Sequence, residues 1–342
     1  MCLACYHPLK RVVTGTYKRK EEVKGQIVER VCQRAMVVPM DYDTDDKPFQ
    51  IIPCGKCIGC RLEYSRNWAN RLMLEFKYHD PNECWFCTFT YDDENVPVNF
   101  YTSSDGRKYP SLSLKKAEFQ QFNKNLRKHY PDGIRFFAAG EYGESTFRPH
   151  VHCIYFSLPL DLEKMVKWSV TDQGFTLYKC PELEEIWNRG NVLLSSVTWE
   201  TCAYVARYVT KKLNGDAAQF YNEFNIEPEF SLMSRRPGIG NQFFLDHPEI
   251  IERGIHVSAG SRAINDVVPR YYKNLYRLTN EKDYDIMDML SKQQSKVSRD
   301  VLDRQWNVQE INSEAERDWC SYLRSKEYQQ KAAAALLKRG DV

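Results

Sequence analysis

Two apolar segments joined by a short loop do most to limit the fold of this chain. Ile134–Tyr142 and Pro149–Phe156 are rich in aromatic and β-branched residues, and the connection between them contains Gly143. Such segments are typical of β-strands, and a short glycine-containing connection joins antiparallel neighbours. The sequence therefore predicts a β-hairpin here, and an antiparallel sheet rather than a doubly wound parallel one.

Other periodic segments surround this hairpin. Cys84–Tyr91 predicts a strand followed by a polar loop, and Ser113–Tyr130 predicts a helix capped by Ser113. Residues 1–60 predict irregular structure. The remaining expected elements are helices at Leu62–Tyr78, Leu160–Trp168, Pro181–Trp187, Trp199–Leu213 and Glu314–Lys338, and a strand at Asn191–Val197.

These elements predict an α+β fold in which helices flank a central antiparallel sheet. We expect an N-terminal cysteine segment and helix at 1–80, a core at 81–215 and a mostly helical C-terminal extension at 216–342. The 342 residues are 42% hydrophobic. This composition is ordinary for a globular protein and excludes a fully disordered or collagen-like chain.

Charge and hydropathy exclude further classes. The chain has 48 Lys and Arg against 46 Asp and Glu, a net charge of +2. Nucleic-acid binding therefore cannot be inferred from the total charge and would need local basic patches. No apolar run approaches the roughly 18 residues that span a bilayer, and the N-terminus lacks the apolar segment of a signal peptide. We expect no membrane association.

His150-Val151-His152 lies in the second strand of the predicted hairpin. Residues two apart in a strand share a face, so both imidazoles project together while Val151 packs on the other side. Glu141, on the partner strand, could complete a three-ligand site, and Glu144 is the alternative because the register is not known. Imidazole, carboxylate and water together suit Mg²⁺ or Mn²⁺. An incidental histidine pair beside a solvated carboxylate is the plainer interpretation.

A second group of polar residues lies on the predicted helix at Trp199–Leu213. Tyr204, Tyr208 and Lys211 are spaced one turn apart and share a stripe with Thr201. The opposite stripe is apolar and is the obvious buried face, so core packing does not by itself explain the tyrosines. A half-buried aromatic pair is the plainer interpretation. The apolar stripe consists of Cys202, Val205, Ala206, Val209 and Leu213.

A tyrosine in this position could act as a nucleophile. Its unperturbed pKa is near 10, so it attacks phosphorus only when a metal polarises the phosphate and the geometry is fixed. Attack on DNA leaves a 5′-phosphotyrosine and a free 3′-hydroxyl, so the strand can be rejoined. A second tyrosine permits a second cleavage while the first linkage persists.

Twelve cysteines occur in a chain with no sign of an oxidising compartment. Clustered thiols then favour metal binding over disulfides. Cys54, Cys57 and Cys60 supply three ligands, and Cys2 or Cys5 could supply the fourth for tetrahedral Zn²⁺. An iron–sulfur cluster is the rival interpretation.

Together these motifs resemble the replication initiator proteins of single-stranded DNA microviruses, especially gokushoviruses, within the HUH endonucleases. The motifs run in order through about two thirds of the chain. They are Cys5–Pro8, Pro53–Cys60, Phe86–Tyr91, Gly140–Glu144, Arg148–His152, Tyr204–Lys211 and Arg236–Gly240.

The resemblance implies a strand-specific nickase that starts rolling-circle replication with Mg²⁺ or Mn²⁺. It implies His150 and His152 as metal ligands, Tyr204 and Tyr208 as nucleophiles, and Lys211 as their associated lysine. It favours Cys5 over Cys2 as the fourth zinc ligand. It also implies a five-stranded antiparallel sheet with the histidines on a central strand.

The same resemblance implies the partners. We expect the single-stranded viral origin to bind through residues that include Arg148, Arg207 and Lys212. No GxxxxGK[ST] motif is present, so a helicase, like the polymerase, would come from the host, and the protein would act in the host bacterial cytoplasm. The rival functions are a non-catalytic, zinc-dependent nucleic-acid-binding regulator and a related HUH relaxase or transposase.

Overall fold

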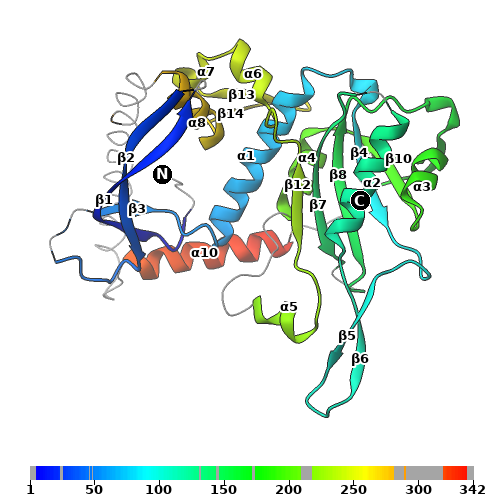
Figure 1. Cartoon of the computed structure of the whole chain (residues 1–342), viewed down its shortest axis with the longest axis horizontal. Coiled ribbons are helices and arrows are strands. Elements are labelled where there is room, and N and C mark those ends of the chain that lie inside the picture. Colours follow the sequence, from blue (N-terminus) through cyan, green and yellow to red (C-terminus); the bar gives the residue numbers. More distant parts are fainter. Residues whose placement is uncertain are drawn as a thin grey trace. The chain divides into compact units, whose positions relative to one another are not determined.

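The computed structural model contains two units (Figure 1). One comprises the described parts of Met1–Glu63 and Pro269–Arg339, and the other comprises those of Tyr64–Val268. The domain limits predicted at residues 80 and 215 stay a prediction. The structure describes residues 5–23, 26–45, 47, 49–130, 132–143, 146–171, 174–208, 218–280, 289 and 319–336.

A seven-stranded antiparallel sheet organises the unit of Tyr64–Val268. Its strand order is β12-β7-β8-β4-β11-β10-β9. The predicted hairpin is present as β7 and β8, and β4 lies on the other side of β8. The strands are β4 (Trp85–Thr90), β7 (Arg135–Tyr142), β8 (Pro149–Phe156), β9 (Val166–Val170), β10 (Thr176–Lys179), β11 (Val192–Ser196) and β12 (Phe230–Met233).

The α+β class with a large antiparallel sheet is therefore confirmed, but the sheet has seven strands rather than about five. One added strand, β9, occupies the segment predicted as the helix Leu160–Trp168. That prediction is wrong, because only the 3₁₀ turn η2 (Leu162–Lys164) is helical there. Val166-Lys167-Trp168-Ser169-Val170 alternates with a period of two, which is the pattern of a strand.

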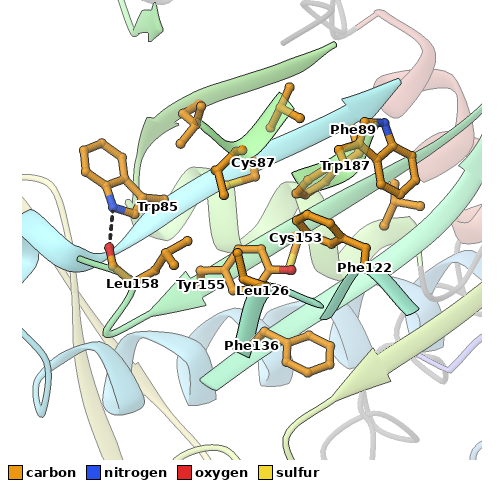
Figure 2. Packing of buried hydrophobic residues seen from close by; sticks show 14 of the residues in the cluster. Trp85, Cys87, Phe89, Phe122, Leu126, Phe136, Cys153, Tyr155, Leu158 and Trp187 are labelled. Carbon is orange, nitrogen blue, oxygen red and sulfur yellow. Dashed lines mark hydrogen bonds between the residues drawn. The ribbon is translucent and has the colours of Figure 1, made fainter. Parts of the chain in front are cut away.

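Helices α2 (Lys116–His129) and α3 (Pro181–Trp187) contribute to the hydrophobic core on one face of the sheet. Figure 2 shows this core, in which Phe89 lies among Phe122, Trp187 and other aromatic rings. The indole of Trp85 donates a hydrogen bond to the Leu158 carbonyl (3.0 Å). Val151, Cys153 and Tyr155 point into this core from β8, as their alternation with the histidines predicts.

The opposite face of the sheet packs against α4 (Trp199–Tyr208) and the later part of α1 (Ile58–Phe76). Cys202, Val205 and Ala206 of α4 are fully buried there. The apolar stripe predicted for this helix is therefore its buried face over the described residues, which end at Tyr208.

The segment between β4 and β7 differs from its prediction. A hairpin of β5 (Val98–Thr102) and β6 (Lys108–Leu112) replaces the expected polar loop. Ser113 does not cap α2, whose N-cap is Lys115. Its hydroxyl instead donates to the Leu114 carbonyl and accepts from the Glu227 amide. Tertiary contacts have thus displaced the local cap.

The irregular structure predicted for residues 1–60 is also wrong. β1 (Leu9–Val23), β2 (Gln26–Val38) and β3 (Phe49–Ile52) form a three-stranded sheet in the order β2-β1-β3. Polar and charged residues interrupt the apolar alternation of these strands, so the hydropathy signal is weak. Helices α8 (Arg270–Thr279) and α10 (Trp319–Leu336) belong to the same unit. The start predicted for the last helix lies outside the described residues.

The described part of 218–268 mixes helices with strands, including a hairpin of β13 and β14. No helix among the described residues is long and apolar enough to cross a membrane. The elements not yet given are η1 (Pro81–Glu83), α5 (Gln219–Glu223), α6 (Asn241–Asp246), α7 (Ile250–Arg253), β13 (Ile255–Ala259) and β14 (Arg262–Asp266).

Candidate active site

The β7–β8 register brings a carboxylate and two imidazoles together on one face of the sheet. Glu141 pairs with His150, and Ala139 pairs with His152. Directly paired residues in antiparallel strands share a face, and so do residues two apart along a strand. Glu141, His150 and His152 therefore converge, whereas the alternative ligand Glu144 lies outside the described residues.

The three side chains are in direct contact. Glu141 Oε1 lies 2.8 Å from His150 Nε2 and 3.0 Å from His152 Nε2. The other ring nitrogens are also engaged. His150 Nδ1 donates to the Arg148 carbonyl (3.2 Å), and His152 Nδ1 lies 3.0 Å from Thr88 Oγ1. These outer contacts fix the rings with both Nε2 atoms toward the carboxylate.

This group is almost entirely buried, since Glu141 is 2% and His152 is 1% exposed. Burial by itself would raise the pKa of the Glu141 carboxyl. Hydrogen bonds from His150 and His152 outweigh that effect and lower its pKa to about 2. The group therefore holds an ionised carboxylate across the whole neutral range.

The donor set fits a divalent cation. One ligand atom from each of Glu141, His150 and His152 lies within 4.8 Å of the other two. Two imidazole nitrogens and one carboxylate oxygen suit a cation that tolerates mixed nitrogen and oxygen ligands, such as Mn²⁺ or Mg²⁺. Three protein ligands leave coordination positions for water or a phosphate oxygen.

Helix α4 places both tyrosines against His152. The ring of His152 stacks on Tyr208 with centroids 4.9 Å apart and meets Tyr204 edge-on at 5.1 Å. The two tyrosine rings are themselves 4.8 Å apart. The pairs predicted from separate motifs, two histidines and two tyrosines, therefore form one aromatic group.

The two tyrosines differ in their surroundings. Tyr208 is 9% exposed, and burial raises its pKa well above the ordinary value for a phenol, with further contributions from Tyr204 and Glu141. Tyr204 is less buried, and its ring packs edge-on against Phe86. Both side chains thus touch the core as well as the histidines, so the packing interpretation describes part of their surroundings.

Two of the basic residues predicted to contact DNA lie beside this group. Arg148 immediately precedes β8, where it donates to the Tyr91 carbonyl and pairs with Asp93 (2.6 Å). The guanidinium of Arg207 lies 5.5 Å from the centre of the Tyr204 ring. Lys211 and Lys212 lie outside the described residues.

Thr88 is a contact that the sequence analysis missed. It lies on β4, pairs directly with His152 and is buried. Strand alternation could have placed Thr88 and Phe86 on one face of β4. No pattern in the sequence indicated that β4 would lie next to the histidine strand.

A separate group of four thiols forms in the other unit. The Sγ atoms of Cys5, Cys54, Cys57 and Cys60 all lie within 4.8 Å of one another. A tetrahedral metal ion with thiolate ligands needs this kind of arrangement, and Zn²⁺ is the usual occupant. The alternative ligand Cys2 lies outside the described residues.

Backbone amides support the sulfurs. The amides of Cys54 and Tyr6 donate to the sulfurs of Cys5 (3.2 Å) and Cys57 (3.3 Å). The Cys54 sulfur accepts from the amides of Lys56 and Cys57. A left-handed turn at Gly55 (φ +72°) allows this last pair of contacts. Cys57 and Cys60 also lie at the start of α1, where the helix dipole favours thiolates.

Comparisons with known proteins agree on one family. A family model for replication-associated proteins of the ORF2 type matches residues 84–213. The chain is 31% identical to replication-associated protein ORF2 of Spiroplasma virus 4 over 308 residues, which cover 88% of each protein. It is 31% identical to replication-associated protein VP4 of Bdellovibrio phage phiMH2K over 254 residues, covering 74% of this chain and 76% of VP4.

A third relative comes from another phage. The chain is 27% identical to replication-associated protein ORF4 of Chlamydia phage 1 over 237 residues, covering 66% of this chain and 53% of that protein. No solved structure matches.

Proposed function

Because this chain belongs to the family of phage replication-associated proteins, we propose that it starts rolling-circle replication by nicking and rejoining single-stranded DNA. The proposed reaction is a metal-dependent transesterification of the HUH type, in which a tyrosine of α4 becomes linked to the 5′-phosphate. The place of action would be the cytoplasm of the bacterial host.

One observation carries this proposal. His152 is in contact with the Glu141 carboxylate through Nε2 and with the rings of Tyr204 and Tyr208. A phosphate held at the Glu141–His150–His152 group would therefore lie next to two phenols. Fixed proximity of this kind can supply a large part of the rate enhancement of a two-group reaction.

The chain's own residues would act as follows. A phenol oxygen of Tyr204 or Tyr208 forms a bond to phosphorus, and the bond from phosphorus to the 3′-oxygen breaks. The phenol loses its proton, and the departing 3′-oxygen ends as a hydroxyl. Because one phosphodiester replaces another, attack by the 3′-hydroxyl reverses the reaction and rejoins the strand.

A divalent cation at the site would polarise the phosphate and stabilise the charge that develops on its oxygens. Glu141, His150 and His152 would hold the cation. Arg148 and Arg207 would contact the DNA backbone, as would Lys212, and Lys211 would assist the tyrosines. A zinc ion at Cys5, Cys54, Cys57 and Cys60 would fix the N-terminal segment on the start of α1.

The test is the covalent adduct between the protein and a labelled single-stranded origin oligonucleotide. We expect the wild-type protein with Mn²⁺ to give an adduct on a denaturing gel. The double variant Tyr204→Phe, Tyr208→Phe should give none while keeping its circular dichroism spectrum. Tyr109→Phe, on the hairpin β5–β6, is the control and should react normally.

An adduct formed by the double variant would contradict the proposal. DNA binding that is unaffected by enough EDTA to remove Mn²⁺ but not Zn²⁺, with no nicking under any condition, would instead support the zinc-dependent regulator that the four-thiol group favours. Cleavage confined to a mobile-element or plasmid transfer end would support the transposase or relaxase.

A further inference from the structure

One edge of the seven-stranded sheet exposes an aromatic ring next to a lysine. Trp168 lies on the edge strand β9 and is 58% exposed. Nζ of Lys179, on the neighbouring strand β10, lies 4.0 Å from the centre of the Trp168 ring. The ammonium group covers one face of the indole and holds the ring in place. An open indole beside a cation can stack on a nucleobase and contact its phosphate.

The strand register places Lys179 on the face of the sheet that carries the histidines. Lys179 pairs with Leu193, Leu193 pairs with Thr88, and Thr88 pairs with His152. These four residues form one row across β10, β11, β4 and β8, and paired residues share a face. With strands about 4.8 Å apart, Lys179 lies about 14 Å along the sheet from His152.

A β-bulge in β9 turns the indole toward the same face. Lys167 pairs with Tyr178 and Ser169 pairs with Leu177, so Trp168 is the extra residue between two paired positions. Bulges of this kind redirect a side chain and interrupt the pairing of a strand. The contact with Lys179 shows that the ring lies on the side of the histidines, whereas Lys167 belongs to the opposite side.

Polar groups connect the two places. Thr90 pairs with His150, and its hydroxyl donates to the Asn191 carbonyl (3.3 Å). The side-chain oxygen of Asn191 in turn accepts from Lys179 Nζ (3.2 Å). The described partners of Lys179 are therefore uncharged, and its positive charge is available for an anion. A DNA strand, which carries both bases and phosphates, matches this row of groups.

We propose that Trp168 and Lys179 form a nucleotide subsite for single-stranded DNA that crosses the sheet between β9 and His152. A base stacks on the open face of the indole, and Lys179 contacts the adjoining phosphate. The inference rests on the proposed function, because it names where the nicked strand continues beyond the site of cleavage.

The test is the affinity of the full-length protein for a fluorescein-labelled oligothymidylate, measured by anisotropy in EDTA so that no cleavage occurs. Trp168→Ala should weaken binding about tenfold, the size expected for the loss of one base stack. Trp168→Phe should keep most of the affinity because it keeps an aromatic face. Lys179→Gln should weaken binding and reduce its salt dependence.

Two matched variants on the same strand serve as controls. Val170 is 53% exposed but pairs with Thr176, on the opposite face from Lys179, so Val170→Ala should bind like the wild type. Lys167→Gln removes an equal charge from that opposite face and should have little effect. Trp168→Ala should also show an unchanged mass by light scattering, since the residue is not expected to join two copies.

The outcomes separate this inference from the function on which it rests. Equal affinities for Trp168→Ala and Val170→Ala, with normal binding by the wild type, overturn the subsite and leave the nicking proposal intact. A dimer that Trp168→Ala dissociates, with DNA affinity unchanged, also overturns it and makes the edge an interface between copies. A wild-type protein that binds no single-stranded DNA overturns both.

Discussion

Glu141 and His150 face each other directly across the β7–β8 ladder, with Oε1 and Nε2 2.8 Å apart. The same carboxylate oxygen reaches His152, two residues further along β8. One buried carboxylate thus orients both imidazoles. This relationship makes Glu141 the residue on which the metal and pH behaviour of the site should depend most.

Glu141→Gln should make the metal-free protein less sensitive to acid. The pKa of Glu141 is lowered from 4.5 to about 2, so its ionised form stabilises the fold above pH 4.5 and this contribution is lost as the pH falls toward 2. Wild type should lose about 2 kcal/mol more unfolding free energy than the variant between about pH 6 and about pH 3. Urea unfolding in EDTA measures this, and parallel curves for the two proteins would contradict it.

Thr88→Val should weaken metal binding without disturbing the fold. The substitution keeps the shape of the side chain but removes the hydroxyl that contacts His152 Nδ1. Loss of such an outer partner typically costs about 10- to 100-fold in metal affinity. Titration of Mn²⁺ by calorimetry measures the effect. Thr176→Val, on β10 and facing the other side of the sheet, is the control, and equal affinities in the two variants would disprove the role of Thr88.

The purified protein should contain one zinc ion held by four thiolates. Cys5→Ser and Cys57→Ser should each lose the metal, because each removes one of the four converging sulfurs. Cys2→Ser and Cys32→Ser should keep it. Elemental analysis decides the matter, and iron with visible absorption in place of zinc would support the iron–sulfur interpretation.

Gly55→Val should destabilise the four-thiol group. Gly55 has φ +72°, a left-handed conformation that costs a residue with a side chain roughly 1–2 kcal/mol. We expect faster release of zinc to a colorimetric chelator and a lower melting temperature. Gly15→Val, on β1 where a Cβ meets nothing within 4 Å, should leave both unchanged. Release rates that match the wild type would show that the turn tolerates a side chain.

The sequence predicted those parts of the fold that short-range patterns encode. The hairpin of β7 and β8, the strand β4 and the helix α3 follow from alternation, a glycine-containing loop and a proline at a helix start. The segments that it missed, β1–β3, β9 and the β5–β6 hairpin, have a weak or mixed hydropathy signal. Their strand structure depends on pairing with segments that propensity alone does not identify.

By itself, the sequence determined which residues are chemically able to act and which of them are neighbours along one element. The period of a strand joins His150 to His152, and the turn of a helix joins Tyr204 to Tyr208. Only the tertiary structure decided that these two pairs meet, that Thr88 rather than another polar residue contacts His152, and that the sulfur of Cys5 approaches that of Cys54. It also decided that Lys179 and Trp168 share a face with the histidines. The physical reason is that strand order, register and bulges are set by packing between distant segments, which no local spacing records.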